Sequence, residues 1–384
     1  STPRIVTNST LLVTNTVVAS SGSNGIYTCA VDTRILGCLI TGSAGTGVSL
    51  RQNDTVAPIQ IPRVSNFLIR ASTVSSNLNS GITAVFANYN AALPTVPVRI
   101  EDCLIEDNVG KRGGGVCDGY LGDGDTDRSS GIQIIGSHIR RNIITGDIGG
   151  GVYFLFNRSP SISGSLLEGN IAQLHGGGIF MRTGSMDGCL VRDNVCYTGN
   201  GGGVAIWVNA ILRNNTVVNN KANIGGGVYI LSGGEIRNSI VYYNKANTSS
   251  NNSGGSMSYS CMTPLTSGAG NISSAPGLAG FRNYRLMPGS PCIDSGSFAF
   301  AVSDYDLDGE PRIWGSGVDM GCDEFYPPGL GGPLAVEVEG STDRAVVGTP
   351  VSFQCDVAGM PESYVWTFTD GYAISNTPFV DHAF

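Results

Sequence analysis

The chain has 384 residues, including 55 glycines; 41% of the residues are hydrophobic and 14% are charged. This composition is too apolar for a disordered chain and too rich in glycine for a helical one. The formal net charge of −8 argues against nucleic acid and anionic membranes as partners, because either would require a basic surface. The sequence has no uncharged apolar run of about 18 residues, so we expect no transmembrane segment.

Residues 1–20 are rich in threonine and valine and lack the repeats that follow. We expect them to form extended strands that flank or cap the first repeat.

Residues 21–252 contain two short motifs that alternate. Glycine triplets, each followed by valine or isoleucine, begin at Gly113, Gly149, Gly176, Gly201 and Gly225. In the other motif, an aliphatic residue or tyrosine and two variable positions precede an asparagine. These asparagines are Asn108, Asn142, Asn170, Asn194, Asn220 and Asn244. The later repeats recur at about 25 residues, a unit too short to bury its own apolar face, so the units must stack on one another.

The runs between the motifs are short, rich in valine, isoleucine and tyrosine, and separated by glycine or asparagine. They lack the apolar spacing of an amphipathic helix. Three strands per repeat at constant length predict an all-β fold, a parallel β-helix with about 25 residues per coil. The asparagines are expected to stack as a ladder of side-chain amides, and the glycines to lie where the backbone needs positive φ or close approach. An antiparallel sandwich is the alternative, and it would not require this fixed spacing.

Beyond residue 252 the period is lost. We expect residues 253–326 to form a cap, because the open end of a parallel sheet exposes unpaired backbone groups. Residues 327–333 are predicted to be a linker from their proline and glycine content. Residues 334–384 are predicted to form a small all-β segment.

Ten cysteines favour an oxidising, extracellular setting with some disulfides. In the cap, Cys261 and Cys292 are expected to be bonded. Three other pairs are near in sequence and could bridge turns or adjacent strands: Cys29 with Cys38, Cys103 with Cys117, and Cys189 with Cys196. The sequence has no CxxC motif and its three histidines lie far apart, so we expect no zinc site.

An aspartate-rich insertion lengthens the repeat between Gly113 and Gly149. Its carboxylates, gathered beside Arg128, are Asp118, Asp123, Asp125 and Asp127. Clustered carboxylates in a glycine-rich loop could hold Ca²⁺ or act as acid and base. A solvated turn is the alternative, since no second acidic set recurs at the same register.

A second acidic run has the D-x-D-x-D-G spacing typical of a Ca²⁺ loop, with Asp304, Asp306 and Asp308 as candidate ligands. It lacks the glutamate at the twelfth loop position. The alternative is an aspartate-rich turn in which Arg312 pairs with a carboxylate such as Asp319.

Other side chains of the repeats carry less specific signals. Arg140, Arg141 and Arg192 lie next to asparagine motifs and are expected to be solvated. Asn251, outside the motif, is also expected to be exposed. Trp207 and Tyr229 are expected to stack from coil to coil, with a sugar-binding face as the alternative.

The alternation of GGG[VI] with [IVLY]xxN, from about Val98 to Asn252, resembles the repeats of polymorphic outer-membrane-type proteins and related right-handed β-helix surface proteins. Residues 270–296 and 306–325 look like the carboxy-terminal cap of secreted bacterial β-helix proteins. W-x-F-x-D-G at 366–371 and H-x-F at 382–384 resemble the first half of a PKD-type Ig-like domain. These resemblances imply a right-handed parallel β-helix, a small carboxy-terminal Ig-like β-sandwich segment and an extracellular or cell-surface location.

Three classes of function stay open. The favoured one is a non-catalytic structural or adhesive protein that associates with itself, head to tail into a filament. In that assembly the strand from Arg4 to Ala19 would complete the Ig-like sheet of a neighbouring copy. The alternatives are a secreted polysaccharide lyase or glycosidase and a carbohydrate-binding module, so extracellular polysaccharide is the other expected partner. We assign no catalytic residue and no required cofactor, with Ca²⁺ as the candidate ion.

Overall fold

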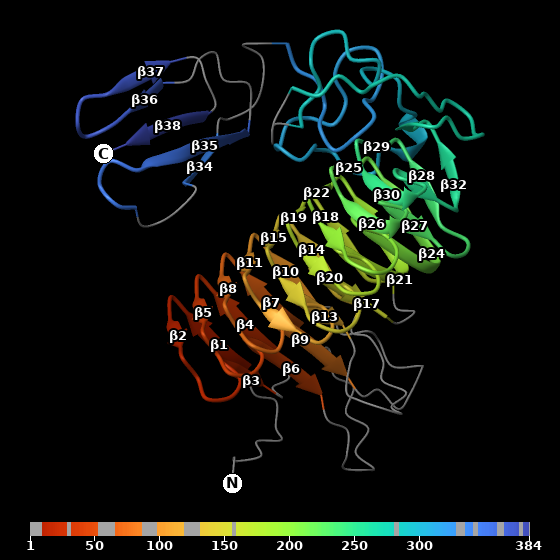
Figure 1. The fold of residues 1–384 in the computed structure, drawn as a ribbon. Coiled ribbons are helices and arrows are strands. Elements are labelled where there is room, and N and C mark those ends of the chain that lie inside the picture. Colours follow the sequence, from red (N-terminus) through yellow and green to blue (C-terminus); the bar gives the residue numbers. More distant parts are fainter. Residues whose placement is uncertain are drawn as a thin grey trace, which may run out of the picture.

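Within the residues described, the chain winds into a solenoid of short parallel strands, followed by a small antiparallel unit (Figure 1). The structure is a computed structural model that describes residues 10–28, 32–52, 66–86, 98–118, 131–155, 159–279, 284–327, 335–340, 345–358, 365–375 and 379–383. The described residues include no helix long and apolar enough to cross a membrane. Their regular structure is β-strand, together with the short 3-10 helix η1 (Phe298–Phe300).

Sheet A, the largest parallel sheet, has 17 strands in two rows. The first row consists of β3 (Ile26–Thr28), β6 (Val48–Gln52), β9 (Ile82–Phe86), β13 (Val116–Asp118), β17 (Val152–Phe154), β21 (Ile179–Asp187), β24 (Val204–Arg213), β27 (Val228–Ile230) and β31 (Asn252–Ser253). The second row consists of β1 (Thr10–Thr14), β4 (Asp32–Leu36), β7 (Asn66–Arg70), β10 (Val98–Glu101), β14 (Gln133–Ile135), β18 (Ser161–Ser163), β28 (Glu235–Arg237) and β32 (Ser256–Ser258). The long strands β21 and β24 pair with both rows and join them.

Sheets B and C complete each coil. Sheet B consists of β2 (Val17–Ala19), β5 (Leu39–Thr41), β8 (Thr73–Ser75), β11 (Leu104–Glu106), β15 (His138–Arg140), β19 (Leu166–Glu168), β22 (Leu190–Arg192), β25 (Thr216–Val218), β29 (Ile240–Tyr242) and β33 (Cys261–Met262). Sheet C consists of β12 (Val109–Gly110), β16 (Ile143–Ile144), β20 (Ile171–Ala172), β23 (Val195–Cys196), β26 (Lys221–Ile224) and β30 (Lys245–Thr248).

The core is a set of apolar ladders that run along the solenoid. In sheet B, residues at one register position of successive coils pair directly and are fully buried: Ile105, Ile139, Leu167, Val191, Val217 and Val241. Side chains alternate between core and exterior along a strand, so a constant register keeps one apolar set inside every coil. The predicted parallel β-helix is thus confirmed.

The separation of stacked asparagines measures the length of each coil. The separation is 34 residues from Asn108 to Asn142 and 28 residues from Asn142 to Asn170. From Asn170 to Asn244 the steps are 24, 26 and 24 residues, close to the predicted repeat. The earlier coils are longer because they carry insertions, such as the aspartate-rich one between β13 and β14.

The glycine triplets stack directly on one another. Gly176, the first of its triplet, has a φ of 65°, a conformation that strains other residues. A Cβ atom on Gly178, the third, would lie 2.7 Å from the carbonyl oxygen of Gly203 in the next coil. A Cβ atom on Gly177 would collide in the same way with the carbonyl oxygen of Gly202. Glycine is therefore required both for the turn and for the close approach of neighbouring coils.

The amino-terminal strands belong to the solenoid. β1 pairs with β4 and β2 pairs with β5, both in parallel. Leu11, Val13 and Val18 pack against the core. The predicted donation of a strand to another copy is therefore wrong for residues 10–19, because they already complete the first coil. Residues 4–9 of that segment lie outside the described residues.

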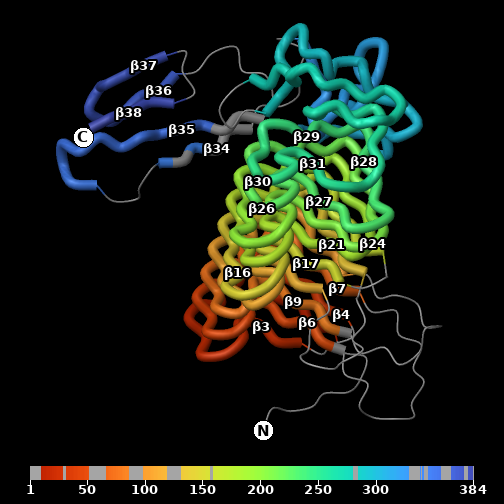
Figure 2. Tube along the Cα trace, turned by 45° about the vertical axis from the view of Figure 1, so that its right-hand side comes forward, coloured from red at the N-terminus to blue at the C-terminus, as the bar shows by residue number. Residues whose placement is uncertain are grey.

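The cap begins later than expected. Parallel pairing continues to Met262, since β32 pairs with β28 and β33 with β29. Residues 263–279 and 284–327 then form an irregular cap over this end of the solenoid (Figure 2). One apolar cluster of the cap packs on Ile240 of the last coils, and another, with Tyr284, packs on Leu190 and Val218. The cap thus covers the end of the solenoid and part of the outer face of sheet B.

The carboxy-terminal unit consists of two small antiparallel sheets. One contains β34 (Ala335–Gly340), β35 (Pro350–Ala358) and β38 (Phe379–Ala383), and the other contains β36 (Val365–Thr367) and β37 (Ala373–Ser375). The rings of Phe353 and Phe368 lie 5.5 Å apart between their centroids. His382 Nε2 lies 2.7 Å from Asp370 Oδ2, so two residues singled out by the motifs meet. The unit fits the predicted small β-sandwich segment.

Candidate functional site

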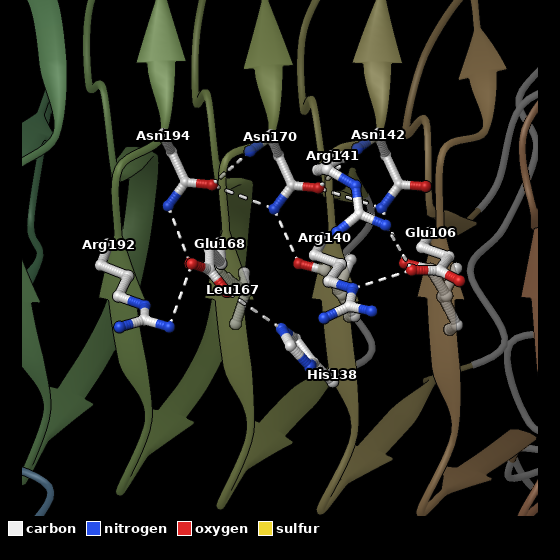
Figure 3. Close-up of polar contacts among 12 residues, drawn as sticks. Glu106, His138, Arg140, Arg141, Asn142, Leu167, Glu168, Asn170, Arg192 and Asn194 are labelled. Atoms are coloured by element: carbon white, nitrogen blue, oxygen red, sulfur yellow. Dashed lines mark hydrogen bonds and ion pairs between the residues drawn. The ribbon is translucent and has the colours of Figure 1, made fainter. Parts of the chain in front are cut away.

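The predicted asparagines form a continuous ladder on the turns between sheets B and C (Figure 3). The Oδ1 atom of Asn170 accepts hydrogen bonds from the Asn142 N–H and the Asn142 Nδ2, both at 3.0 Å. The Nδ2 atom of Asn170 donates to Asn194 Oδ1 at 3.0 Å and to the Ile139 carbonyl at 2.8 Å. The same side-chain bond links all six predicted residues in order: Asn108, Asn142, Asn170, Asn194, Asn220 and Asn244.

The ladder extends beyond these six at both ends. Asn77 Nδ2 donates to Asn108 Oδ1 at 2.8 Å. At the other end, Asn251 Oδ1 accepts from the Asn244 N–H at 3.1 Å, and Asn251 is buried. The expectation that Asn251 is exposed is therefore wrong: Asn251 directly precedes β31, and its side chain fills the next position of the ladder.

From Asn77 to Asn244, each ladder turn contains a left-handed residue just before the asparagine. The φ angle is 55° at Asp107, 52° at Arg141 and 57° at Asp193. Such angles are rare outside glycine, asparagine and aspartate. The position before each asparagine is thus restricted in backbone conformation, even though its residue type varies.

A second ladder, on the turns between sheets A and B, was not predicted from the sequence. The N–H of Cys103 donates to Ser137 Oγ at 3.2 Å, and the N–H of Ser137 donates to Ser165 Oγ at 3.1 Å. The register position is occupied by Cys38, Ser72, Cys103, Ser137, Ser165, Cys189, Asn215, Ser239 and Ser260. In most coils the sequence has a glycine, asparagine or aspartate directly before this serine, cysteine or asparagine, and that pair of residues was the available signal. In the structure the first residue of the pair has a positive φ.

The second ladder explains why two predicted bridges in the coils are wrong. Cys103 and Cys189 point into the core, where their thiols bond to main-chain carbonyls. Cys117 belongs to a different, outward cluster, and the Cys196 thiol donates to the Gln173 carbonyl. All four are free thiols. Cys29 lies outside the described residues.

Charged residues form a third ladder on the outer face of sheet B (Figure 3). Glu106, Arg140, Glu168 and Arg192 occupy one register position in four successive coils, with alternating sign. Arg140 Nε lies 2.8 Å from Glu106 Oε2, and Arg192 Nη2 lies 3.0 Å from Glu168 Oε1. His138 Nε2 approaches the other oxygen of Glu168, at 3.3 Å. The charges therefore join neighbouring coils.

The arginines of this face differ in exposure. The Arg141 side chain is 46% exposed, as expected, and binds Glu106 at 2.6 Å. The Arg192 side chain is 2% exposed, so the prediction that it is solvated is wrong. The cap causes this burial, because the Tyr284 ring lies over the guanidinium at 5.4 Å. The Tyr284 hydroxyl also accepts a hydrogen bond from Asn219 at 2.7 Å.

The predicted Ca²⁺ loop is not assembled from its three aspartates. Asp304 is exposed, whereas Asp306 is buried and accepts the N–H groups of Asp308 and Glu310 at 2.9 Å. Asp308 forms an ion pair with Arg285, and Ca²⁺ binding by the run stays a prediction.

A different acidic group converges in the cap. Ligand atoms of Asp306, Glu310 and Asp323 all lie within 4.8 Å of one another, and all three residues are buried. The Leu286 N–H donates to Asp323 at 3.1 Å, and Arg285 Nε lies 3.7 Å from its other oxygen. The carboxylate oxygens of Asp306 and Asp323 already accept backbone N–H groups or face an arginine. Ca²⁺ binding at this group stays a prediction.

Burial sets the charge state of the cap carboxylates. It raises the pKa of Asp306 and of Asp319 to about 6, against the opposing effect of backbone N–H donors. It raises the pKa of Glu324 to about 8, and the nearby Asp319 adds to the effect.

The predicted pairing of Arg312 with the Asp319 carboxylate takes another form: Arg312 Nη2 donates to the Asp319 main-chain carbonyl at 2.9 Å.

The other acidic candidates are only partly described. Asp118 is fully buried at the end of β13. Asp123, Asp125 and Asp127 lie outside the described residues.

An aromatic and polar cluster near the first row of sheet A was not predicted as a site. The His175 ring stacks on Tyr229 at 6.5 Å and meets Trp207 edge-on at 6.2 Å. Burial lowers the pKa of His175, against the effect of the nearby Asp147. The Nδ1 atom of His175 is buried and has no hydrogen-bond partner among the described residues. Asp147 in turn forms an ion pair with Arg112.

Cys261 and Cys292 lie together in the cap. Both are fully buried in one apolar cluster, and the Cys261 thiol donates to the Ser274 carbonyl at 3.2 Å. The structure holds them as free thiols, so the bond between them stays a prediction.

Comparison with known proteins adds one match. Residues 59–256, more than half of the chain, match the model of a family described as a right handed beta helix region. No curated protein and no solved structure matches the chain. The narrower resemblances, to outer-membrane-type repeats and to a PKD-type domain, stay predictions.

Proposed function

Because the chain belongs to the right-handed β-helix family, we propose that it is a non-catalytic structural or adhesive protein of the cell surface or extracellular space. Family membership shows the fold and leaves the activity open, since this fold also carries polysaccharide lyases and glycosidases. The choice rests on what the charged side chains of the solenoid do.

The observation that carries the proposal is the use of charge between coils. Acid and base catalysis requires a titratable group within reach of the substrate. Along the solenoid, however, three acidic residues each bind an arginine of the next coil. These pairs are Glu106 with Arg140, Glu168 with Arg192, and Asp187 with Arg213. Side chains used in this way stiffen a rod, which supports the role of a scaffold.

A location outside the cell is part of the proposal. It is supported by the ten cysteines of the chain and by the contact between Cys261 and Cys292, which an oxidising compartment would convert to a disulfide.

Self-association is a further part of the proposal. Among the described residues, β1, β2 and β3 each pair with a neighbour on one side only. Such an edge is a template for another chain. Leu12 on β1 is 59% exposed, and a lysine there would discourage pairing. We expect light scattering to show wild-type assemblies that Leu12→Lys abolishes; a monomeric wild type at high concentration would contradict this part.

Incubation of the full chain with acidic and neutral polysaccharides, with Ca²⁺ present, tests the central claim. Release of unsaturated uronates and of reducing ends is measured, and the proposal expects neither above the protein-free blank. Electron micrographs of the same material should show rods or filaments of uniform width. Turnover that depends on a residue of this chain would overturn the proposal.

A polysaccharide lyase or glycosidase is the second candidate, and the cluster around His175 is the observation that favours it. His175 lies near the Asp147–Arg112 pair, and Trp207 beside it is 37% exposed. Histidine can transfer a proton, arginine can neutralise an anionic sugar, and an aromatic ring can pack on a sugar face. If any glycan is cleaved, this candidate predicts that His175→Ala abolishes cleavage while His138→Ala, a matched change on sheet B, does not.

A further inference from the structure

We propose that Cys261 and Cys292 form a disulfide that fastens the cap to the last coil. The cysteines buried in the coils, such as Cys103 and Cys189, stay reduced and pack in the core. The sequence spacing suggested this pair; the structure supplies the contact and the role.

The two residues come from the two parts that the bond would join. Cys261 lies on β33, the last strand of sheet B, and pairs with Ile240 of the preceding coil. Cys292 lies in the cap, where its N–H donates to Ser290 Oγ at 3.1 Å and its carbonyl accepts from the Met320 N–H at 3.0 Å. Both side chains lie fully buried in one apolar cluster, where the last coil meets the cap.

Other cysteines have different neighbours. The Cys103 thiol donates to the Glu101 carbonyl at 3.1 Å, and the Cys189 thiol donates to the Asp187 carbonyl at 3.4 Å. Both thiols occupy the register position that serine fills in other coils. These cysteines replace a hydroxyl in the second ladder, so they are expected to remain free.

The chemistry sets the time at which the bond forms. Two thiols lose two protons and two electrons, and a small-molecule or protein disulfide accepts them and becomes two thiols. The attacking group is a thiolate, and the nearby Cys261 thiol together with burial raises the pKa of Cys292. Both sulfurs are also shielded from solvent. Oxidation is therefore expected while the cap closes during folding, and it should be slow once the reduced protein has folded.

Peptide mapping tests the connectivity. The full chain is refolded from the reduced, denatured state in mixed reduced and oxidised glutathione, alkylated, and digested without reduction. We expect one linked pair of peptides, carrying Cys261 and Cys292, with Cys103 and Cys189 alkylated. Alkylation of both Cys261 and Cys292, or linkage of either to another cysteine, would overturn the proposal.

Two further measurements test the timing and the fastening. Folded, reduced protein given the same glutathione mixture should stay unlinked over the time in which refolding gives full linkage; equal rates would overturn the proposed order. Reductant should lower the melting temperature of the oxidised wild type and of Cys103→Ser, but leave the double variant Cys261→Ala/Cys292→Ala unchanged. An unchanged wild type would show that the bond does not fasten the cap.

Discussion

The coils and the cap of this molecule bury charge in different ways. In the coils, an acidic residue meets an arginine at the same register position one coil away, as Glu168 meets Arg192. In the cap, Asp306, Asp319 and Glu324 accept backbone N–H groups instead. A repeat offers each charge a partner at a fixed place, whereas a single irregular segment satisfies its carboxylates mainly with its own backbone. The stability of the two parts should therefore respond to different changes.

The largest effect is expected from the asparagine ladder, on which the coils depend and the cap does not. Asn194→Leu removes the acceptor of the Asn170 N–H and of one Asn170 Nδ2 hydrogen in the core. Two buried groups without hydrogen bonds, each costing about 1 to 3 kcal/mol, should lower the free energy of unfolding by about 4 kcal/mol. Urea unfolding followed by circular dichroism measures this.

The matched control is Asn247→Leu, because Asn247 is exposed and its side chain donates to the Asn223 side chain. It should change the free energy of unfolding by less than about 0.5 kcal/mol. Equal effects of the two changes would show that the ladder does not stabilise the coils.

The charged ladder gives the next effect, and it tests whether the cap matters to the coils. Glu168→Gln removes the negative charge next to Arg192, which the cap buries, and should cost about 3 kcal/mol. Glu106→Gln removes the equivalent charge next to Arg140 and Arg141, which are 12% and 46% exposed, and should cost about 1 kcal/mol.

A second substitution distinguishes the ion pair from simple packing. Replacing both partners, as in Glu168→Gln/Arg192→Met, leaves no buried charge and should recover much of the stability lost in Glu168→Gln. If the double variant is no more stable than the single one, the uncompensated arginine is not the cause. Chemical denaturation of the three proteins decides this.

Much of the solenoid could be predicted from the sequence because its two motifs mark fixed places in every coil. Each triplet, such as the one at Gly176, marks a turn where coils touch, and each asparagine marks the next turn. Once both recur at a constant spacing, the register follows, and with it the apolar ladders. The coils before Gly113 departed from this pattern, because they lack complete glycine triplets and differ in length.

The charged ladder and the cap could not be predicted in this way. Glu168 and Arg192 are 24 residues apart in sequence, like Asn170 and Asn194, and their meeting depends on the register of the whole sheet. In the cap the partners are farther apart: the Cys322 N–H donates to Thr216, 106 residues away. The aspartate spacing at 304–308 was real, but burial and backbone donors decided which carboxylates converged.

The pH dependence of stability should separate the cap from the coils. Burial raises the folded-state pKa of Asp306 and Asp319 to about 6 and that of Glu324 to about 8. A raised carboxyl pKa stabilises the fold at low pH, and this contribution is lost as the pH rises through the folded pKa. The cap should therefore become less stable between pH 5 and about pH 8.

Thiol labelling in urea reports this locally, with Cys322 as the probe of the cap and Cys103 as the probe of the coils. After correction for intrinsic thiol reactivity, the urea midpoint for Cys322 should fall by a larger amount than that for Cys103 as the pH rises. Glu324→Gln should flatten the cap response above pH 6. A Cys322 midpoint that rises with pH would contradict the assignment.

The smallest effect is expected at two turns of the second ladder, where different residues adopt one backbone conformation. Ala71 has a φ of 48° and Gly164 has a φ of 51°, and each directly precedes a ladder serine. A left-handed alanine costs about 1 to 2 kcal/mol, part of which glycine loses again through the flexibility of the unfolded chain. Ala71→Gly should therefore raise the free energy of unfolding by about 0.5 kcal/mol. Gly164→Ala should lower it by about 1 kcal/mol through backbone strain alone, because an added methyl group has open space there. Both changes should alter the Cys103 midpoint in opposite directions; a shift of the same sign would mean that packing, and not the backbone angle, governs these turns.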